Sequence, residues 1–296
     1  MAHELQERYS KLIAAKLRAS LVTKTNVIFN DYYEGDPKAG AVKIPVRDAN
    51  PTVSNYSKTN VASNAMSYGS TQYITAVIDN DKFVNEYIDG YEAAAVPDGI
   101  VADRLDSAGY ALALTEDVTG IATLVNAAQG LDKSGVAFAS TDPRYGKAGN
   151  VDTVTLSATN AYDTFVDLGI YHDTANVPRD GRYALVSPAA YGYLLKDDNF
   201  IRQGDLSQRL KESGAIGMIA GYAIYESNNL GKIGNDAVEI VAGHPKYATR
   251  VDEWMIQPHL QDLNGDANVV GGSAVKGRWI FTHEVTSPEA IAVVHA

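Results

Sequence analysis

The sequence predicts an α+β fold, and three patterns support this expectation. Apolar residues recur at helical spacing from residue 98 to about 128, the longest periodic element of the chain. Two β-prone runs, residues 41–47 and 71–78, stand on either side of a long polar segment. Residues 183–186 are typical of a strand, which leads through Ser187 and Pro188 into a short helix.

Composition limits the classes of protein to consider. A chain of 296 residues suggests about two domains and can bury a sizeable core. It has no cysteine, which excludes disulfides, thiolate metal sites and cysteine nucleophiles, and fits a reduced compartment such as the bacterial cytoplasm. The net charge of −11 argues against a free DNA-binding protein, because affinity for a duplex depends on Lys and Arg. It is compatible with a wall that encloses DNA without gripping phosphates.

The N-terminal part is expected to be a helix at residues 4–22, followed by an extended hairpin. We expect no secretory signal there, and no run approaches the ~18 apolar residues that a membrane span needs. Pro45 lacks an amide hydrogen, so the strand at 41–47 should lie at an edge. Residues 50–68 are too polar to build a core, and an isolated two-stranded ribbon is marginal in water. A neighbouring subunit is therefore the expected support for this hairpin.

Tyrosine is unusually frequent, with 18 residues against six phenylalanines. Its apolar ring and polar tip suit half-buried surfaces such as interfaces. Most of these residues are expected to line the edges of the chain's own core. Tyr56, Tyr68 and Tyr73, on the hairpin, are the ones predicted to contact another chain.

The remaining elements alternate between helices and strands. Residues 81–95 are predicted to be helical and to end at Pro97, with Asp98 as the N-cap of the long helix. The Gly-, Ser- and Asp-rich stretch 130–150 indicates a loop or domain boundary. A helix is expected at 157–171, and strands at 222–225, 237–242, 254–260, 275–284 and 288–294.

No motif for catalysis, a cofactor or a metal stands out, so we predict neither an enzyme nor a cofactor. Asp262, Asn264 and Asp266 have the spacing of a calcium loop, but Ala267 and Ser273 occupy the positions where an EF-hand needs Gly and Glu. An Asn-Gly turn is the simpler interpretation. The six histidines lack metal-site spacing. A site assembled from distant residues, such as His172, Asp173 and His244, remains an alternative for a soluble α/β enzyme or ligand-binding domain.

Four segments carry a family resemblance: RYALVSPAAYGYLL (182–195), GMIAGYAIYESNNL (217–230), VAGHPKYA (241–248) and VTSPEAIAV (285–293). Their order and spacing resemble the major capsid proteins of tailed bacteriophages, whose fold is shared with herpesvirus shells and encapsulins. The resemblance implies an N-terminal arm (1–38), an extended hairpin loop (39–78), a peripheral domain with a spine helix (79–155), an inserted axial domain (156–242) and return strands that complete the peripheral domain (243–296).

The resemblance also implies a function. Such a chain self-assembles into pentamers and hexamers of an icosahedral head that encloses double-stranded DNA, with scaffolding, portal and decoration proteins as partners and no membrane. It would be found in the virion after assembly in the host cytoplasm. An encapsulin-like compartment is the alternative on the same fold. Leu5 and Leu12 are the arm residues expected to dock on a neighbour, and Lys43 and Lys58 lie in the hairpin, although no motif supports the Lys–Asn cross-links of some members.

Overall fold

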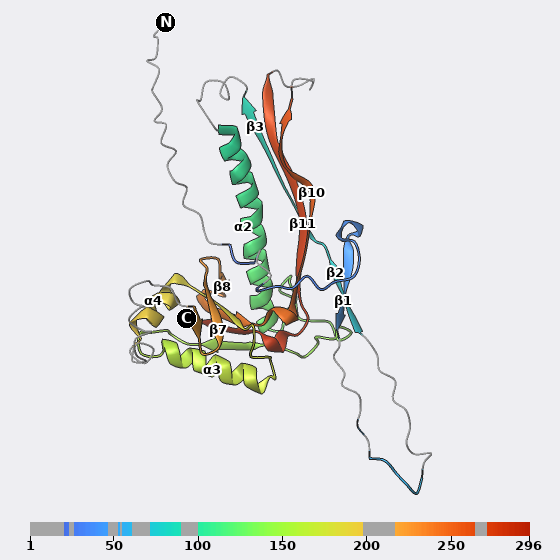
Figure 1. Ribbon diagram of the computed structural model, residues 1–296, viewed down its shortest axis with the longest axis vertical. Helices are drawn as coiled ribbons and strands as arrows, with labels where there is room; N and C mark the ends of the chain where they lie inside the picture. Colours follow the sequence, from blue (N-terminus) through green and yellow to red (C-terminus); the bar gives the residue numbers. More distant parts are fainter. Residues whose placement is uncertain are drawn as a thin grey trace.

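The computed structural model (Figure 1) places a long helix beside a long three-stranded sheet, above a smaller body built on a second sheet. It describes residues 21–23, 27–46, 53, 55–60, 72–89, 100–197, 217–263 and 271–296. Among these residues, no helix is long and apolar enough to span a membrane. The predicted helix at 4–22 and the predicted Asp98 cap therefore lie almost wholly outside the described residues.

The predicted hairpin strands are confirmed. β1 (Ala41–Val46) and β2 (Gln72–Val77) pair antiparallel, with Ala41 opposite Val77 and Val46 opposite Gln72. Alternate residues of both strands form one apolar face, and this face packs against Val251 of the same subunit. Since these two strands form a sheet of their own, the strand that carries Pro45 is an edge strand, as expected.

The prediction of a helix at residues 81–95 is wrong. Residues Asn80–Asp89 form strand β3, which pairs with β11 (Gly272–Val285), itself paired with β10 (Ala248–Asp262). Val84 and Ile88 are four residues apart, a spacing that fits one face of a helix and equally one face of a strand. The long strand β11 offers ten consecutive partners, and this tertiary pairing decides the outcome.

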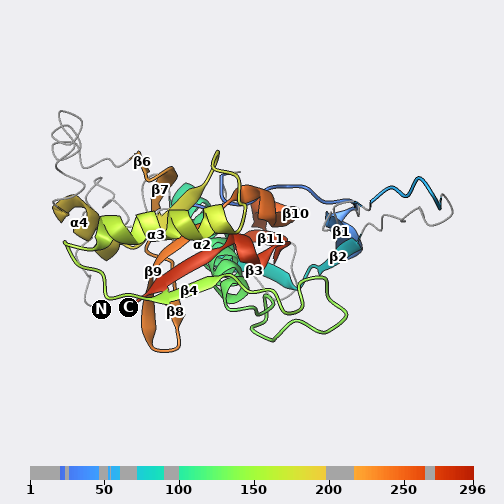
Figure 2. The same ribbon diagram turned by 90° about the horizontal axis from the view of Figure 1, so that it is seen from below.

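The predicted spine helix is confirmed as α2 (Ile100–Ala128). Its first part packs on β3 and β11 through Leu105 and Ala108, and its middle packs through Leu112 on Trp279. Its last turns reach the second sheet, where Ile121 and Leu124 are fully buried. The helix thus connects the long sheet with the smaller body, as Figures 1 and 2 show.

The second sheet has seven strands: β4 (Asn150–Thr153), β12 (Ala292–His295), β9 (Asp236–Gly243), β5 (Tyr183–Val186), β7 (Tyr222–Glu226), β6 (Met218–Ile219) and β8 (Lys232–Ile233). One face, including Leu185 and Val241, packs on the end of α2. The other, including Val186 and Ile240, packs on α3 (Ala161–Thr174) and α4 (Pro188–Lys196). Because both faces are covered, β5 and β12 are buried along their whole length.

Most sequence predictions for this region are confirmed, with shifted ends. The helix expected at 157–171 begins at Ala161, and Ser187 caps α4 by accepting a hydrogen bond from the Ala190 amide. The strand expected at 288–294 is shorter, because residues Pro288–Ala290 form a 3-10 turn. Strand β12 pairs with β4 and β9, while β10 and β11 belong to the long sheet, so residues 243–296 contribute strands to both sheets. The domain bounds themselves remain a prediction.

Candidate subunit interface

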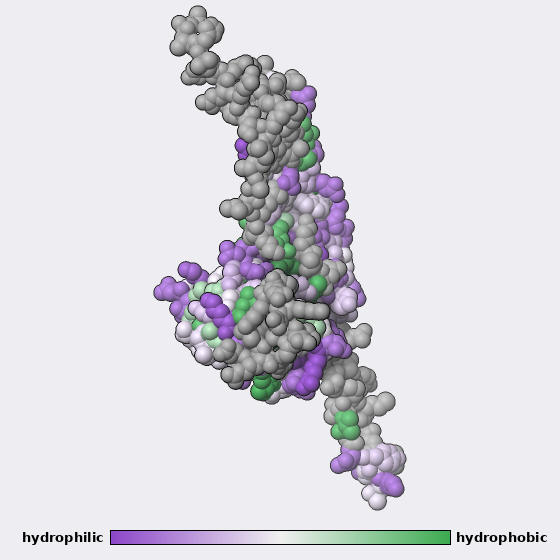
Figure 3. Space-filling view, turned by 60° about the vertical axis from the view of Figure 1, so that its left-hand side comes forward, coloured by the Kyte–Doolittle hydropathy of each residue, from purple (hydrophilic) through white to green (hydrophobic). Residues whose placement is uncertain are grey.

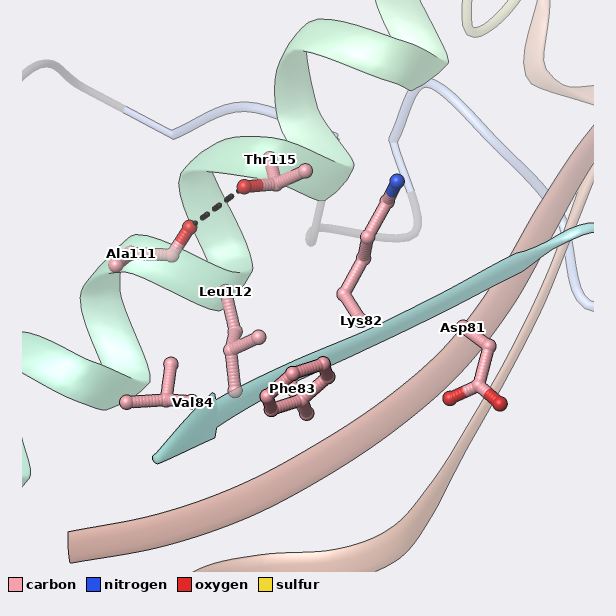
Figure 4. Close-up of a pocket in the computed structure, with 7 residues that line it drawn as sticks. All are labelled: Asp81, Lys82, Phe83, Val84, Ala111, Leu112 and Thr115. Atoms are coloured by element: carbon pink, nitrogen blue, oxygen red, sulfur yellow. Dashed lines mark hydrogen bonds between the residues drawn. The ribbon is translucent and has the colours of Figure 1, made fainter. Parts of the chain in front are cut away.

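A groove of about 320 Å³ lies between α2 and β3 and is the first candidate for a contact with another chain. Figure 4 shows Leu112 pointing from the helix toward the strand, next to Val84 and Phe83. The groove is also lined by Asp81, Lys82, Ala111 and Thr115. The Thr115 hydroxyl donates to the Ala111 carbonyl within the helix at 2.9 Å.

The floor of the groove rests on a pair of stacked tryptophans. Leu112, only 3% exposed, packs in one cluster with Trp279. Trp279 and Trp254 are directly opposite each other on neighbouring strands, and their rings stack with centroids 4.5 Å apart. A partner that entered the groove would therefore meet a preformed surface.

The outer face of the long sheet carries an exposed row of three residues. Ile256, Arg278 and Phe83 lie directly opposite one another on β10, β11 and β3. Phe83 is 72% exposed and Ile256 is 47% exposed. Arg278 donates from Nε to Asp81 Oδ1 at 2.8 Å, and this hydrogen bond lowers the pKa of Asp81. The apolar side chains of Ile256 and Phe83 thus lie on either side of Arg278, whose charge is balanced by Asp81.

Apolar groups of this kind recur over the surface. Figure 3 shows small hydrophobic patches among mostly hydrophilic residues along one face of the molecule. Near the far end of β3, the Tyr87 ring is 52% exposed and lies across Gly272, where a side chain would collide with it. Exposed aromatic groups held in place in this way are typical of interface residues.

Five of the seven residues predicted from the sequence to contact another chain belong to the hairpin, and the structure describes four of these five. Tyr56 is 69% exposed and Tyr73 is 48% exposed, while Lys43 and Lys58 are exposed as well. The Lys43 ammonium lies 6.0 Å from the centre of the Tyr73 ring. Residues 55–60 lie far from the sheets, at the lower end of Figure 1. Leu5, Leu12 and Tyr68 lie outside the described residues, and the interface role of all seven remains a prediction.

Sequence reasoning missed the groove and the exposed row. Both depend on β3, for which the sequence pattern predicts a helix, and on its register with β11. Composition is the signal that could have found the strand: Phe83, Val84, Tyr87 and Ile88 within ten residues are more typical of a strand than of a helix.

The alternative enzyme site is a structural cluster around one buried histidine. His172 is fully buried, and its Nδ1 lies 2.5 Å from the Tyr222 hydroxyl. Burial lowers its pKa to about 4. Asp173 accepts hydrogen bonds from Arg179 and Arg182, which lower its pKa to about 2. His244 Nε2 lies 2.8 Å from the backbone oxygen of Asp180.

These contacts tie the end of α3 to the turn before β5, and the sealed His172 ring cannot reach a substrate. No group of three potential metal ligands occurs among the described residues. Of the calcium-loop residues, Asp262 ends β10, and Asn264 and Asp266 lie outside the described part of the chain.

Comparison with known proteins gives a result only at the level of structure. No protein-family profile and no curated protein matches the chain. A solved chain from Mycobacterium phage Che8 matches with a TM-score of 0.70 and 22% identity, over 98% of this chain and 96% of that chain. The capsid of cyanophage P-SCSP1u matches with a TM-score of 0.73 and 16% identity, over 98% of this chain and 92% of that chain. The mature capsid of bacteriophage PhiM1 matches with a TM-score of 0.69 and 14% identity, over 98% of this chain and 91% of that chain. This chain therefore has the phage major-capsid fold.

Proposed function

We propose that this protein is a major capsid protein, which self-assembles into pentamers and hexamers of an icosahedral head that encloses double-stranded DNA. The observation that carries this proposal is the likeness to phage capsid chains over 98% of its length. Because the likeness covers 98% of this chain, few of its residues lie outside the compared fold.

The groove between α2 and β3 is the proposed seat of a neighbouring subunit's hairpin. Beyond its paired strands β1 and β2, the hairpin is expected to need support from another subunit, and its described residues include the exposed Val53 and Tyr56. The groove exposes part of Val84 and the rim residue Phe83 above the buried Leu112. Insertion of an aromatic ring would remove apolar surface from water on both sides, the usual source of stability at the centre of an interface.

The acidic charge fits this function. With a net charge of −11, the wall would enclose the DNA without binding its phosphates tightly. The proposal includes no sequence-specific contacts to the packaged DNA. Scaffolding, portal and decoration proteins are the further partners that the proposal implies, and the bacterial cytoplasm is the place of assembly.

The test is assembly of the full chain, alone and together with the genes that neighbour it, followed by negative-stain microscopy and light scattering. Closed shells, tubes or capsomer rings are expected. Tyr56→Ser and Phe83→Ser should reduce assembly strongly without loss of folding, because both side chains are exposed in the subunit. Tyr145→Ser is the matched control, as Tyr145 is 60% exposed and lies outside hairpin and groove. A chain that stays monomeric under all these conditions would contradict the proposal.

A further inference from the structure

A carboxylate in the middle of the spine helix holds residues 21–23, the arm root, which lie within the predicted N-terminal arm (1–38). Asp117 is completely buried. Its Oδ1 accepts hydrogen bonds from the Val22 amide at 2.8 Å, the Thr23 amide at 2.9 Å and the Thr23 hydroxyl at 2.9 Å. The carbonyl of Thr23 in turn accepts from Arg250 Nη1 at 3.0 Å. Residues 21–23 are thus held by the spine helix on one side and by β10 on the other.

The other oxygen of the same carboxylate holds a loop of the second sheet. Asp117 Oδ2 accepts from Asn229 Nδ2 at 2.8 Å. Asn229 lies in the loop 227–231 between β7 and β8, and its amide donates to the Ser227 hydroxyl at 3.2 Å. The Ser227 amide donates to the Val186 carbonyl at 3.0 Å. The arm root and this loop are therefore two hydrogen bonds apart, through one side chain.

Burial makes the two contacts dependent on each other. A buried carboxylate is tolerated only when hydrogen-bond donors replace its water, and here four donors from two separate segments do so. If one segment moves away, the carboxylate must turn or admit water, and either change weakens its bonds to the other segment.

We propose that Asp117 couples the position of the arm root to the conformation of loop 227–231. The loop lines a pocket of about 320 Å³ together with Ser187 and Glu239, so an arm that is pulled or docked would change that pocket, and an occupant of the pocket would change the arm. The coupling is a property of the single subunit. Only its use, to report arm docking to this loop of the second sheet, rests on the proposed function.

Residue-resolved amide hydrogen exchange on the unassembled protein tests the coupling from both ends. Asn229→Ala should speed exchange of the Val22 and Thr23 amides by about fivefold or more, the lower range of coupling between sites. Thr23→Val, which removes only the hydroxyl bond, should speed exchange of the Ser227 and Asn229 amides in return. Asn235→Ala is the control, because Asn235 is exposed in the next turn of the chain. This variant should leave the exchange of the Val22 and Thr23 amides and of the Ser227 and Asn229 amides unchanged.

Exchange within β12 reports whether a variant is folded, since this strand is buried in the core and pairs with β4 and β9. If Asn229→Ala speeds exchange only in residues 227–231, and Thr23→Val only in residues 21–23, the two segments are independent and the proposal is wrong. Because no assembly is involved, this result would leave the capsid function untouched.

Discussion

Lys133 donates a hydrogen bond from its Nζ to the Val77 backbone carbonyl at 2.6 Å, which fixes the base of the hairpin to the body of the subunit. Val77 is the last residue of β2, and Lys133 lies in the loop after α2. The same ammonium donates to the Thr282 hydroxyl at 2.8 Å and lies 3.3 Å from Glu284 Oε1. A single cation therefore joins the hairpin, the loop and the long sheet.

Lys133→Met should free the hairpin and destabilise the subunit by about 1–3 kcal/mol, because the Val77 carbonyl and Glu284 both lose a charged donor. Glu284 keeps its ion pair with Arg144, whose Nη1 lies 2.7 Å from Glu284 Oε2, and this contact limits the loss of unfolding free energy. Urea unfolding measures the change, and Lys232→Met, at an exposed position, is the control. An unfolding free energy equal to that of the control would show that Lys133 does not anchor the hairpin.

Two glycines inside α2 should respond in opposite ways to alanine. A Cβ added at Gly109 would meet no atom within 4 Å, so Gly109→Ala should stabilise the helix by up to about 1 kcal/mol. At Gly120 the methyl group would lie 3.1 Å from His283 Nε2 and 3.2 Å from Thr23 Cγ2. Gly120→Ala should therefore lose this gain or destabilise the protein. Thermal unfolding of both variants provides the comparison, and an equal rise in Tm would contradict the crowding at Gly120.

The sequence was sufficient for elements whose pattern is local. The spine helix, the hairpin strands and the turn from Val186 through Ser187 into α4 each carry their own signal, either periodicity or a capping residue. The family resemblance supplied their order. These features were confirmed because nothing distant is needed to form them.

Elements that depend on distant partners were missed or misread. Strand β3 takes its conformation from β11, almost two hundred residues later, as in the pair Asp81 and Ile280. β4 was not predicted, since its four residues become a strand only beside β12. The role of Asp117 was hidden for the same reason: Thr23 and Asn229 are remote in sequence, and an acidic residue in a helix is usually a solvated one.

The start of β4 allows a direct test of the pairing with the C-terminal strand. A Cβ at Gly149 would overlap the Ile291 carbonyl oxygen and lie 2.8 Å from that of Pro288, and backbone atoms cannot move aside cheaply. Gly149→Ala should therefore destabilise the protein by about 3 kcal/mol or more. Gly192→Ala, in a helix with open space around it, should not. Equal stability of the two variants in urea would refute the placement of β12 beside β4.

Two buried histidines should make stability depend on pH in a defined window. Burial lowers the pKa of His172 to about 4 and that of His283 to about 3, from an ordinary value of 6.5. Their contribution is complete above pH 6.5 and is lost as the pH falls toward these values, because the unfolded chain binds the protons first. The unfolding free energy should fall by up to ~1.4 kcal/mol per pH unit for each histidine between pH 6.5 and 4. His172→Asn should remove about half of this slope, and an unchanged slope would show that His172 is not the titrating group.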